Sequence, residues 1–227
     1  MSTITIMQPA ERADAWHISL DGRYAFTLDT TTVAEERLAV GKTLDGTDLD
    51  RLRAAADDRR ILDAALAFLA PRPRSREEIR RRLLRPRRGK VGKEGYSPEA
   101  IERVLEKLDR MGLIDDAAFA AWWAEQRRSS GNPHGTGAIQ SELARHGVDR
   151  EIAREAAATD DDEALAFVAA RRKVSSLARL DWRTFEQRLS GYLMRRGFAY
   201  SVTRGVVRAL WQETHGGLSD DDESAEE

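Results

Sequence analysis

The chain has 227 residues, 33% of them charged, yet its formal net charge is only −2, and its length permits one sizeable core or two to three small stacked units. The absence of cysteine excludes disulfides, thiolate metal sites and cysteine nucleophiles, and it is typical of proteins from a reducing compartment. No apolar run approaches the roughly 20 residues that cross a bilayer, and no signal peptide opens the sequence, so we expect a cytoplasmic protein without membrane contact.

The N-terminal segment alternates apolar and polar side chains on both sides of Asp21-Gly22. Aspartate and glycine tolerate the positive φ angles of a tight turn, so this pattern predicts a β-hairpin. A two-stranded ribbon is marginal in water and should therefore pack on the rest of the chain or on a partner. The alternating apolar residues are Ile4, Ile6, Trp16, Ile18, Leu20, Tyr24, Phe26 and Leu28.

From Leu49 the apolar spacing becomes that of an amphipathic helix, which Pro71 and Pro73 end because proline lacks the amide proton. Local signals then mark the ends of two further helices. These signals are the capping box Ser75-Arg-Glu-Glu78, the start Ser97-Pro98-Glu99 and the stop at Met111-Gly112.

Two later segments align with each other, which indicates an internal repeat. In both, an apolar residue precedes a leucine by one helical turn, and a glycine and another apolar residue follow. The aligned residues are Ile139, Leu143-Ala-Arg-His-Gly147-Val148, Ile152 and Ala156 in one segment, and Leu189, Leu193-Met-Arg-Arg-Gly197-Phe198, Val202 and Val206 in the other. A looser copy contains Ile79, Leu83, Leu84, Gly95-Tyr96, Ile101 and Leu105. Leucine pairs and capping glycines are common in helical proteins, so coincidence is the alternative.

The repeat predicts a mainly α fold in which tandem three-helix repeats form an elongated, curved array after a small N-terminal β-hairpin region. The expected parts are a hairpin with a short helical extension at 1–48, a linker helix with the first repeat at 49–114, a second repeat at 115–158, a third repeat at 159–215 and a disordered acidic tail at 216–227.

Charge is distributed unevenly along the chain. Nine arginines and two lysines lie between Arg72 and Lys93, against only Glu77 and Glu78. Like-charge repulsion in this basic segment favours a surface that binds a polyanion over the alternative of a solvated helix face. Six carboxylates lie in the last eight residues, and their opposite charge motivates the hypothesis that the tail competes for the basic segment.

The candidate binding residues are arginines and lysines, because a guanidinium group donates two parallel hydrogen bonds to a phosphate and stays charged. Phosphate contacts position a protein without reading bases, so we expect little sequence preference. The candidates are Arg72, Arg74, Arg76, Arg80, Arg81, Arg82, Arg85, Arg87, Arg88, Lys90, Lys93, Arg127, Arg128, Arg171, Arg172, Lys173, Arg195 and Arg196.

Aromatic residues gather in the segment before Arg127-Arg128, where Phe119, Trp122, Trp123 and Gln126 fall on adjacent faces of a predicted helix. Most of this surface should belong to the core of the second repeat. An exposed tryptophan beside the arginines is an alternative, as a stacking platform for a base or for an arginine of a partner.

No catalytic residue, metal ligand or cofactor site is predicted. Gly41-Lys42-Thr43 lacks the glycine that a phosphate-binding loop needs five residues earlier, where Glu36 stands. Asp115-Asp116 precedes a helix and is better explained by N-capping than by a paired acid site. The four histidines have no ligand spacing; they are His17, His134, His146 and His215.

Three motifs follow one another in the first and second repeats: Ala65-Leu66-x-x-Leu69, Arg74-Ser75-Arg76-Glu77-Glu78-Ile79, and Leu105-x-x-Leu108-x-x-x-Gly112-Leu113-Ile114-Asp115-Asp116-x-x-Phe119-Ala120. This series resembles the RecX family of recombination regulators, and the likeness continues through Gly137, Ile139, Glu142-Leu143 and Gly147-Val148. It covers about two-thirds of the chain. The basic insertion from Pro86 to Glu94 and the acidic tail depart from the family pattern.

The resemblance implies a regulatory protein, not an enzyme, which binds along the groove of a RecA filament and restrains its ATPase and strand exchange. The implied partners are the RecA filament and single-stranded DNA, with double-stranded DNA as a further candidate, and the protein is expected to be a monomer. The alternative is a direct DNA-binding protein or transcriptional regulator, since helix-turn-helix-like units with a glycine in the turn resemble recognition modules. No repeat has an obvious recognition helix rich in asparagine or glutamine.

Overall fold

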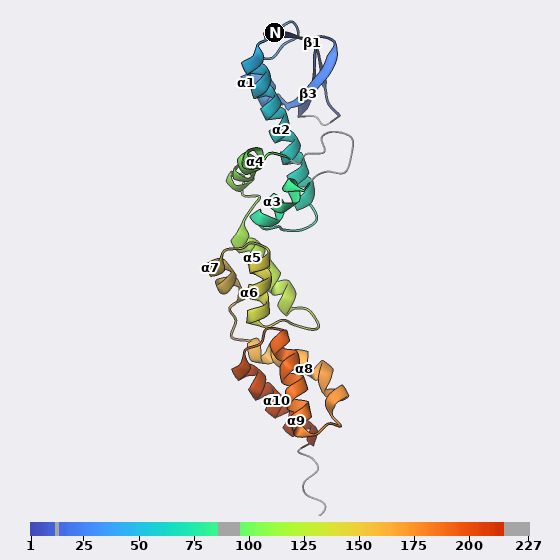
Figure 1. Ribbon diagram of the computed structural model, residues 1–227, viewed down its shortest axis with the longest axis vertical. Coiled ribbons are helices and arrows are strands. Elements are labelled where there is room, and N and C mark those ends of the chain that lie inside the picture. The colour runs from blue at the N-terminus through green and yellow to red at the C-terminus, as the bar shows by residue number, and fades with distance from the viewer. Residues whose placement is uncertain (12–13, 86–95, 216–227) are drawn as a thin grey trace, which may run out of the picture. The chain divides into compact units, whose positions relative to one another are not determined.

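The computed structural model describes residues 1–11, 14–85 and 96–215 and is mainly helical, as predicted (Figure 1). The basic insertion and the acidic tail lie outside the described residues, as do Arg87, Arg88, Lys90 and Lys93. The elements in chain order are β1 (Ser2–Pro9), β2 (Ala15–Leu20), β3 (Arg23–Asp29), α1 (Thr30–Glu35), β4 (Thr43–Leu44), α2 (Gly46–Leu69), α3 (Arg76–Leu84), α4 (Pro98–Arg110), α5 (Asp116–Arg128), α6 (Thr136–Arg145), α7 (Arg150–Ala157), α8 (Asp162–Leu177), α9 (Trp182–Arg195) and α10 (Tyr200–His215).

The chain folds as two units, one of residues Met1–Ile114 and one that begins at Asp115. In the part of the chain that is described, no helix combines the length and apolar character that a membrane span requires.

The first unit begins with a four-stranded antiparallel sheet of order β3-β2-β1-β4. The predicted hairpin is confirmed as β2 and β3, and its turn places Asp21 at φ 49° and Gly22 at φ 80°. β1 and β4 extend this hairpin, so the region is larger than a ribbon. Ile18 and Phe26 face each other across the hairpin and are buried.

Helix α2 connects two hydrophobic cores within the first unit. Leu52 and Ala56, in its first half, pack against the buried face of the sheet. Ile61 and Ala65, in its second half, pack against α3 and α4. The sheet therefore rests on the helical part of the chain, and α2, α3 and α4 form the first three-helix repeat (Figure 1).

The second unit contains two more three-helix repeats, α5–α7 and α8–α10, each with its own core. Both middle helices end at a glycine with positive φ, Gly147 at 78° and Gly197 at 87°. The amide after each glycine donates to the carbonyl five residues earlier, from Val148 to Leu143 and from Phe198 to Leu193. This is the Schellman arrangement that terminates a helix and turns the chain into the next one. Tandem three-helix repeats are thus confirmed.

The second and third repeats join through backbone contacts between glycines. Gly135 donates its amide proton to the carbonyl of Arg196 at 2.9 Å, and Gly137 donates to that of Gly197 at 3.0 Å. A Cβ atom at Gly197 would lie 2.1 Å from the amide nitrogen of Ala138. The absence of side chains at these positions therefore allows α6 to begin directly against the turn after α9.

Candidate functional site

Helix α3 is the described part of the basic segment, and a capping box sets its start. The Ser75 hydroxyl accepts from the Glu78 amide at 3.1 Å, and the Glu78 carboxylate accepts from the Ser75 amide at 3.3 Å, as predicted. Ile79 and Leu83 are buried against α2 and α4, which leaves the arginines of this helix on its other faces. The capping box and the buried face together fix where the guanidinium groups lie.

The expectation that only Glu77 and Glu78 neutralise these arginines is wrong. Arg80 donates to Glu102 on α4 at 2.7 Å, and Arg76 lies 3.3 Å from the same carboxylate and 3.6 Å from Asp109. The hydrogen bond from Arg80 lowers the pKa of Glu102, and the bond to Glu102 raises the pKa of Arg80. Helix α4 thus supplies two carboxylates that the basic segment itself lacks.

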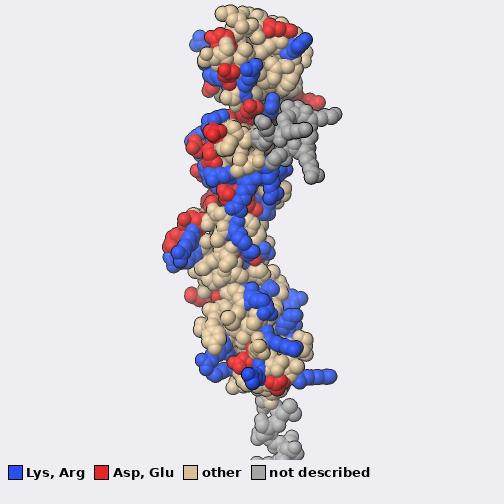
Figure 2. Space-filling model, viewed as in Figure 1, with Lys and Arg blue, Asp and Glu red and all other residues tan. Residues whose placement is uncertain are grey.

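The remaining pairs of this region use the acidic residues of α3. Arg72 and Arg81 donate to Glu78 and Glu77, each at 2.7 Å. Arg74 lies over the ring of Phe68, 4.1 Å from its centroid, and burial lowers its pKa. Figure 2 accordingly shows basic and acidic side chains interleaved over α3 and α4. Most of the described basic segment is a network of ion pairs rather than an unbalanced cationic face.

Arg82 and Arg85 differ from their neighbours on α3. Both are exposed, and neither has an ion-pair partner among the described residues. Arg82 lies 5.9 Å from the centroid of the Phe68 ring, and Arg85 is the C-cap residue of the helix. Among the described candidates of this segment, they are the two whose charge is available to a partner.

In the second repeat, Glu142 organises a partly buried polar cluster. Its carboxylate accepts from Arg127 at 2.6 Å and from the indole of Trp123 at 2.8 Å, and it lies 3.2 Å from His134. Arg127 also covers the Trp123 ring at 4.3 Å from its centroid. Phe119 is core, as predicted, while Trp123 is occupied by these contacts. At Trp123, the stacking platform inferred from the sequence is therefore already covered by a guanidinium group of the chain itself.

Burial and hydrogen bonding shift the titrations of this cluster. Burial works to raise the pKa of Glu142, but hydrogen bonds from Arg127 and Trp123 outweigh it, so this pKa lies below its usual value. Burial, with a contribution from the nearby Arg196, lowers the pKa of His134. The cluster thus favours a charged Glu142 beside a neutral His134.

Three candidate arginines hold the chain to itself. Arg128 donates to the carbonyls of residues 156 and 158, and Arg172 donates to that of Gly131 at 2.6 Å. Arg196 donates to the carbonyls of Asn132 and Pro133. Arg128 thus ties the end of α5 to the end of α7, whereas Arg172 and Arg196 bind the loop between α5 and α6 to the third repeat, so the first role of all three is structural.

The other candidates of the third repeat are more open. Arg171 lies 3.8 Å from Glu213, Lys173 lies 5.6 Å from the centroid of the Tyr192 ring, and Arg195 is exposed without an ion-pair partner in the described residues. Over the three helices of the third repeat, from residue 162 to 215, the sequence has ten arginines and lysines against five carboxylates. The excess of cationic side chains therefore lies in the third repeat as well as in the basic segment, on part of the face drawn in Figure 2.

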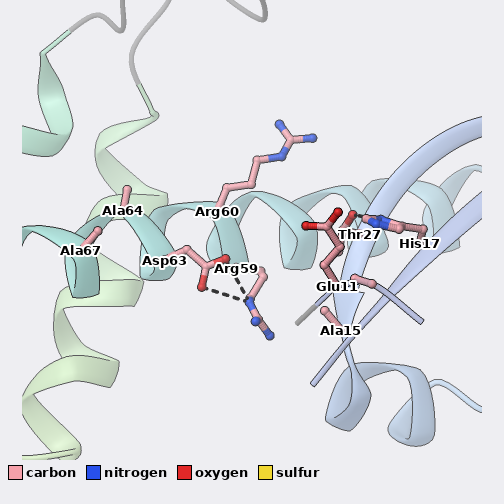
Figure 3. A pocket seen from close by; sticks show the side chains of 10 residues that line it. Glu11, Ala15, His17, Thr27, Arg59, Arg60, Asp63, Ala64 and Ala67 are labelled. Atoms are coloured by element: carbon pink, nitrogen blue, oxygen red, sulfur yellow. Dashed lines mark hydrogen bonds and ion pairs between the residues drawn. The ribbon is translucent and has the colours of Figure 1, made fainter. Parts of the chain in front are cut away.

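A groove of about 550 Å³ lies between the sheet and α2, lined by Ala10, Glu11, Ala15, His17, Thr27, Arg59, Arg60, Asp63, Ala64 and Ala67 (Figure 3). Arg59 is only 10% exposed and pairs with Asp14 and Asp63. The hydrogen bond to Asp14 raises the pKa of Arg59. Among the described lining residues, nothing combines a nucleophile with a base and an oxyanion donor.

The sequence features considered for other chemistry have structural roles. Gly41 is in a turn at φ 91°, and Lys42 donates to the carbonyl of Glu36 at 2.5 Å. Asp115 accepts from the amide of Ala118 at 2.9 Å and caps α5, as predicted. The described residues contain no group of histidine and acidic side chains that could hold a metal ion.

One exposed arginine, Arg145 at the end of α6, was not among the predicted site residues. The alignment of the repeats identifies it, because Arg145 stands two residues after Leu143 and the candidate Arg195 stands two residues after the equivalent Leu193.

Comparison with known proteins identifies both repeats of the second unit. Residues 115–156 match the family model of the second three-helix domain of RecX, and residues 160–207 match that of the third. Regulatory protein RecX of Amycolatopsis mediterranei (strain U-32) is 37% identical over 154 residues, which are 65% of this chain and 83% of that protein. Regulatory protein RecX of Prosthecochloris aestuarii is 36% identical over 155 residues, which are 68% of this chain and 96% of that protein.

More distant relatives and solved structures cover most of the chain. Regulatory protein RecX of Lactobacillus johnsonii is 28% identical over 214 residues, 92% of this chain and 75% of that protein. A crystal structure of regulatory protein RecX superimposes with a TM-score of 0.74 at 23% identity and covers 91% of this chain and 98% of its own. The structure of RecX from Lactobacillus salivarius gives 0.56 at 21% identity, with 68% and 96% covered. At these identities the structures establish the fold, including the strands before the first repeat.

Proposed function

Because this chain belongs to the RecX family of regulatory proteins, we propose that it binds the RecA nucleoprotein filament as a cytoplasmic monomer and restrains the filament's ATPase and strand exchange. The observation that carries the proposal is the match to regulatory relatives along nearly their whole length, together with two matched three-helix domains. Regulation by binding requires no catalytic group of the chain's own.

Tandem repeats suit a filamentous partner on physical grounds. Each repeat is a small three-helix bundle, and several weak contacts made by one chain add through effective concentration, which raises the overall affinity by about 10²–10⁴ over a single contact. A filament offers the same surface many times, whereas a single RecA protomer or a bare DNA strand offers only part of it. Affinity for the assembled filament should therefore exceed affinity for either component.

The described side chains available for such contacts are fewer than the sequence suggests. Arg82, Arg85 and Arg195 are exposed and have no ion-pair partner among the described residues. Arg171 has a long ion pair to the exposed Glu213, and Lys173 has a ring contact to the half-buried Tyr192. We propose these five as contacts with the filament or its DNA. We propose a structural role for the ion-paired arginines of α3, because a phosphate could bind them only by displacing their carboxylate partners.

The test is the rate of ATP hydrolysis by RecA on single-stranded DNA, titrated with the full chain. The proposal predicts a saturable fall in rate at protein concentrations well below those that saturate bare DNA. An Arg82→Ala/Arg85→Ala variant should need about tenfold more protein, and Arg53→Ala/Arg154→Ala, which removes two exposed charges elsewhere, should match the wild type. An unchanged rate at saturation would contradict the proposal.

A further inference from the structure

The three repeats carry an arginine at the same place. In the middle helix of each repeat, a buried apolar residue is followed four positions later by a buried leucine. Two positions after this leucine, an arginine stands at the end of the helix. The equivalent residues are Ile79, Leu83 and Arg85 in α3, Ile139, Leu143 and Arg145 in α6, and Leu189, Leu193 and Arg195 in α9.

These arginines are exposed although the residues that define their register are buried. A cation in the last turn interacts favourably with the helix C-terminus, which is worth roughly 0.3–1 kcal/mol and would explain one such residue. It does not require arginine, because lysine would serve as well. Arginine at all three positions indicates a group that accepts paired hydrogen bonds.

Arg145 and Arg195 line one hollow of about 450 Å³ between the second and third repeats. Gly137, Ala138 and Gly197 are also in its wall, so little side chain prevents a ligand from approaching the backbone. The described residues that line it include no phenylalanine, tyrosine or tryptophan of the kind that anchors a protein partner. An oxyanion such as a phosphate group fits this hollow better than the surface of a protein partner does.

The electrostatics of the hollow favour an anion. Its carboxylate, Glu142, is 13% exposed and already accepts from Arg127 and Trp123. His134 lies in the same wall. Burial lowers its pKa, which favours the neutral imidazole, so it does not compete with the arginines for an anion. Arg145 and Arg195 are the cationic side chains of its described wall, and Arg145 also donates through Nε to the carbonyl of Ser141 at 3.3 Å.

The junction between the repeats holds the two arginines in a fixed relation. Gly137 donates to the carbonyl of Gly197 at 3.0 Å, and Arg196 donates to the loop that precedes α6. Arg196 and Gly197 directly follow Arg195, and Gly137 lies on α6, the helix that ends at Arg145. The hollow is thus built before a ligand arrives, which reduces the entropy lost on binding.

We propose that Arg145 and Arg195 clamp the phosphodiester backbone of a nucleic-acid strand across the hollow between the second and third repeats, and that Arg85 offers the equivalent contact on the first. This inference rests on the proposed function, because it assigns the DNA of the filament to a particular site. Binding by backbone contacts carries no sequence preference.

The experiment measures fluorescence anisotropy of a labelled oligo(dT) strand, bare and coated with RecA, over a range of salt concentrations. Each phosphate contact to a single strand contributes about 0.7 to the slope of log affinity against log salt. Arg145→Ala/Arg195→Ala should therefore lower the slope on bare DNA by about 1.4. The loss of affinity relative to the wild type should consequently be about 25-fold larger at 0.1 M salt than at 1 M salt. Arg145→Lys/Arg195→Lys should retain most of the slope and lose part of the affinity.

The matched control is Arg204→Ala/Arg208→Ala, which removes two exposed charges from α10 outside the hollow. It should leave the slope within about 0.3 of the wild type, and circular dichroism should show that all variants fold. Equal losses of slope in the control and in the Arg145/Arg195 variant would overturn the clamp. A loss of affinity on RecA-coated DNA with an unchanged slope on bare DNA would also overturn it, because the arginines would then contact protein. Wild-type protein that binds bare DNA but not the filament would instead refute the proposed function and leave the clamp standing.

Discussion

The arginines of this protein belong to two physically different groups. Arg128, Arg172 and Arg196 donate to backbone carbonyls, and removing any of them would remove hydrogen bonds that hold chain segments together. Arg85 and Arg195 are exposed and have no ion-pair partner among the described residues. Substitution of the first group should therefore reduce stability, whereas substitution of the second should reduce binding.

Glu142 links stability to pH. Its pKa in the folded chain lies below the ordinary 4.5 because bonds from Arg127 and Trp123 outweigh its burial. As pH falls through 4.5 the unfolded chain takes up this proton first, so the stabilisation present above that pH is lost by the time pH passes the folded pKa. Glu142→Gln should lower the free energy of unfolding at pH 7 by about 1.5–3 kcal/mol and flatten its fall as the pH drops below 4.5.

Urea denaturation at a series of pH values measures both effects. Glu125→Gln, an exposed position on α5, controls for the loss of one negative charge and should follow the wild type. A Glu142→Gln curve parallel to that of the wild type throughout the acidic range would show that this carboxylate is not coupled to folding.

The residues of the candidate site were only partly predictable from the sequence. The sequence shows which residues are cationic, but it does not show which of them are neutralised by ion pairs. Glu102 is 22 residues from Arg80 in the sequence and contacts it only because α4 packs beside α3. The structural role of Arg196 depends on a loop 63 residues earlier. Arg145 was missed although the aligned repeats contain it, since it stands alone and not in a cluster of charge.

At the scale of helices and strands, locally encoded features agree with the sequence. The capping box at Ser75, the N-cap at Asp115 and the turn at Asp21-Gly22 each involve residues a few positions apart, so spacing alone identifies them. The pairing of β4 with β1 joins segments distant in sequence, Thr3 with Thr43, which local spacing does not reveal, and the predicted hairpin is part of a four-stranded sheet. The three-helix repeats were predictable because the same local pattern occurs more than once.

The junction between α6 and α9 depends on glycine. Gly197 adopts φ 87°, and a Cβ atom there would overlap the backbone of Ala138. Gly197→Ala should therefore lower the free energy of unfolding by at least about 2 kcal/mol, because it combines left-handed strain with a backbone clash. Gly205→Ala, within α10 and with nothing within 4 Å of the added atom, should instead raise it by about 0.4–1 kcal/mol.

Guanidinium denaturation of the two variants provides the comparison. If Gly197→Ala unfolds at the wild-type midpoint, α6 does not begin against the turn after α9 as described, and the fixed relation of the second and third repeats would have to be abandoned.

At the scale of the whole molecule, the proposed function depends on repetition. Three bundles in one chain each bury their own core, so substitutions on the exposed face of one repeat leave the other cores intact. Weak contacts made by linked repeats combine into strong binding only where the partner presents matching surfaces together. The protein should consequently distinguish an assembled RecA filament from its separate components.

The most direct test compares the affinity of the full chain for RecA assembled on oligo(dT), for oligo(dT) alone and for RecA alone, at one salt concentration near 0.15 M. The account predicts that the filament binds at least about 100-fold more tightly than either component, as linked contacts require. Equal affinity for filament and bare DNA would contradict it, because the chain would then be a DNA-binding protein for which the filament is only a carrier of DNA.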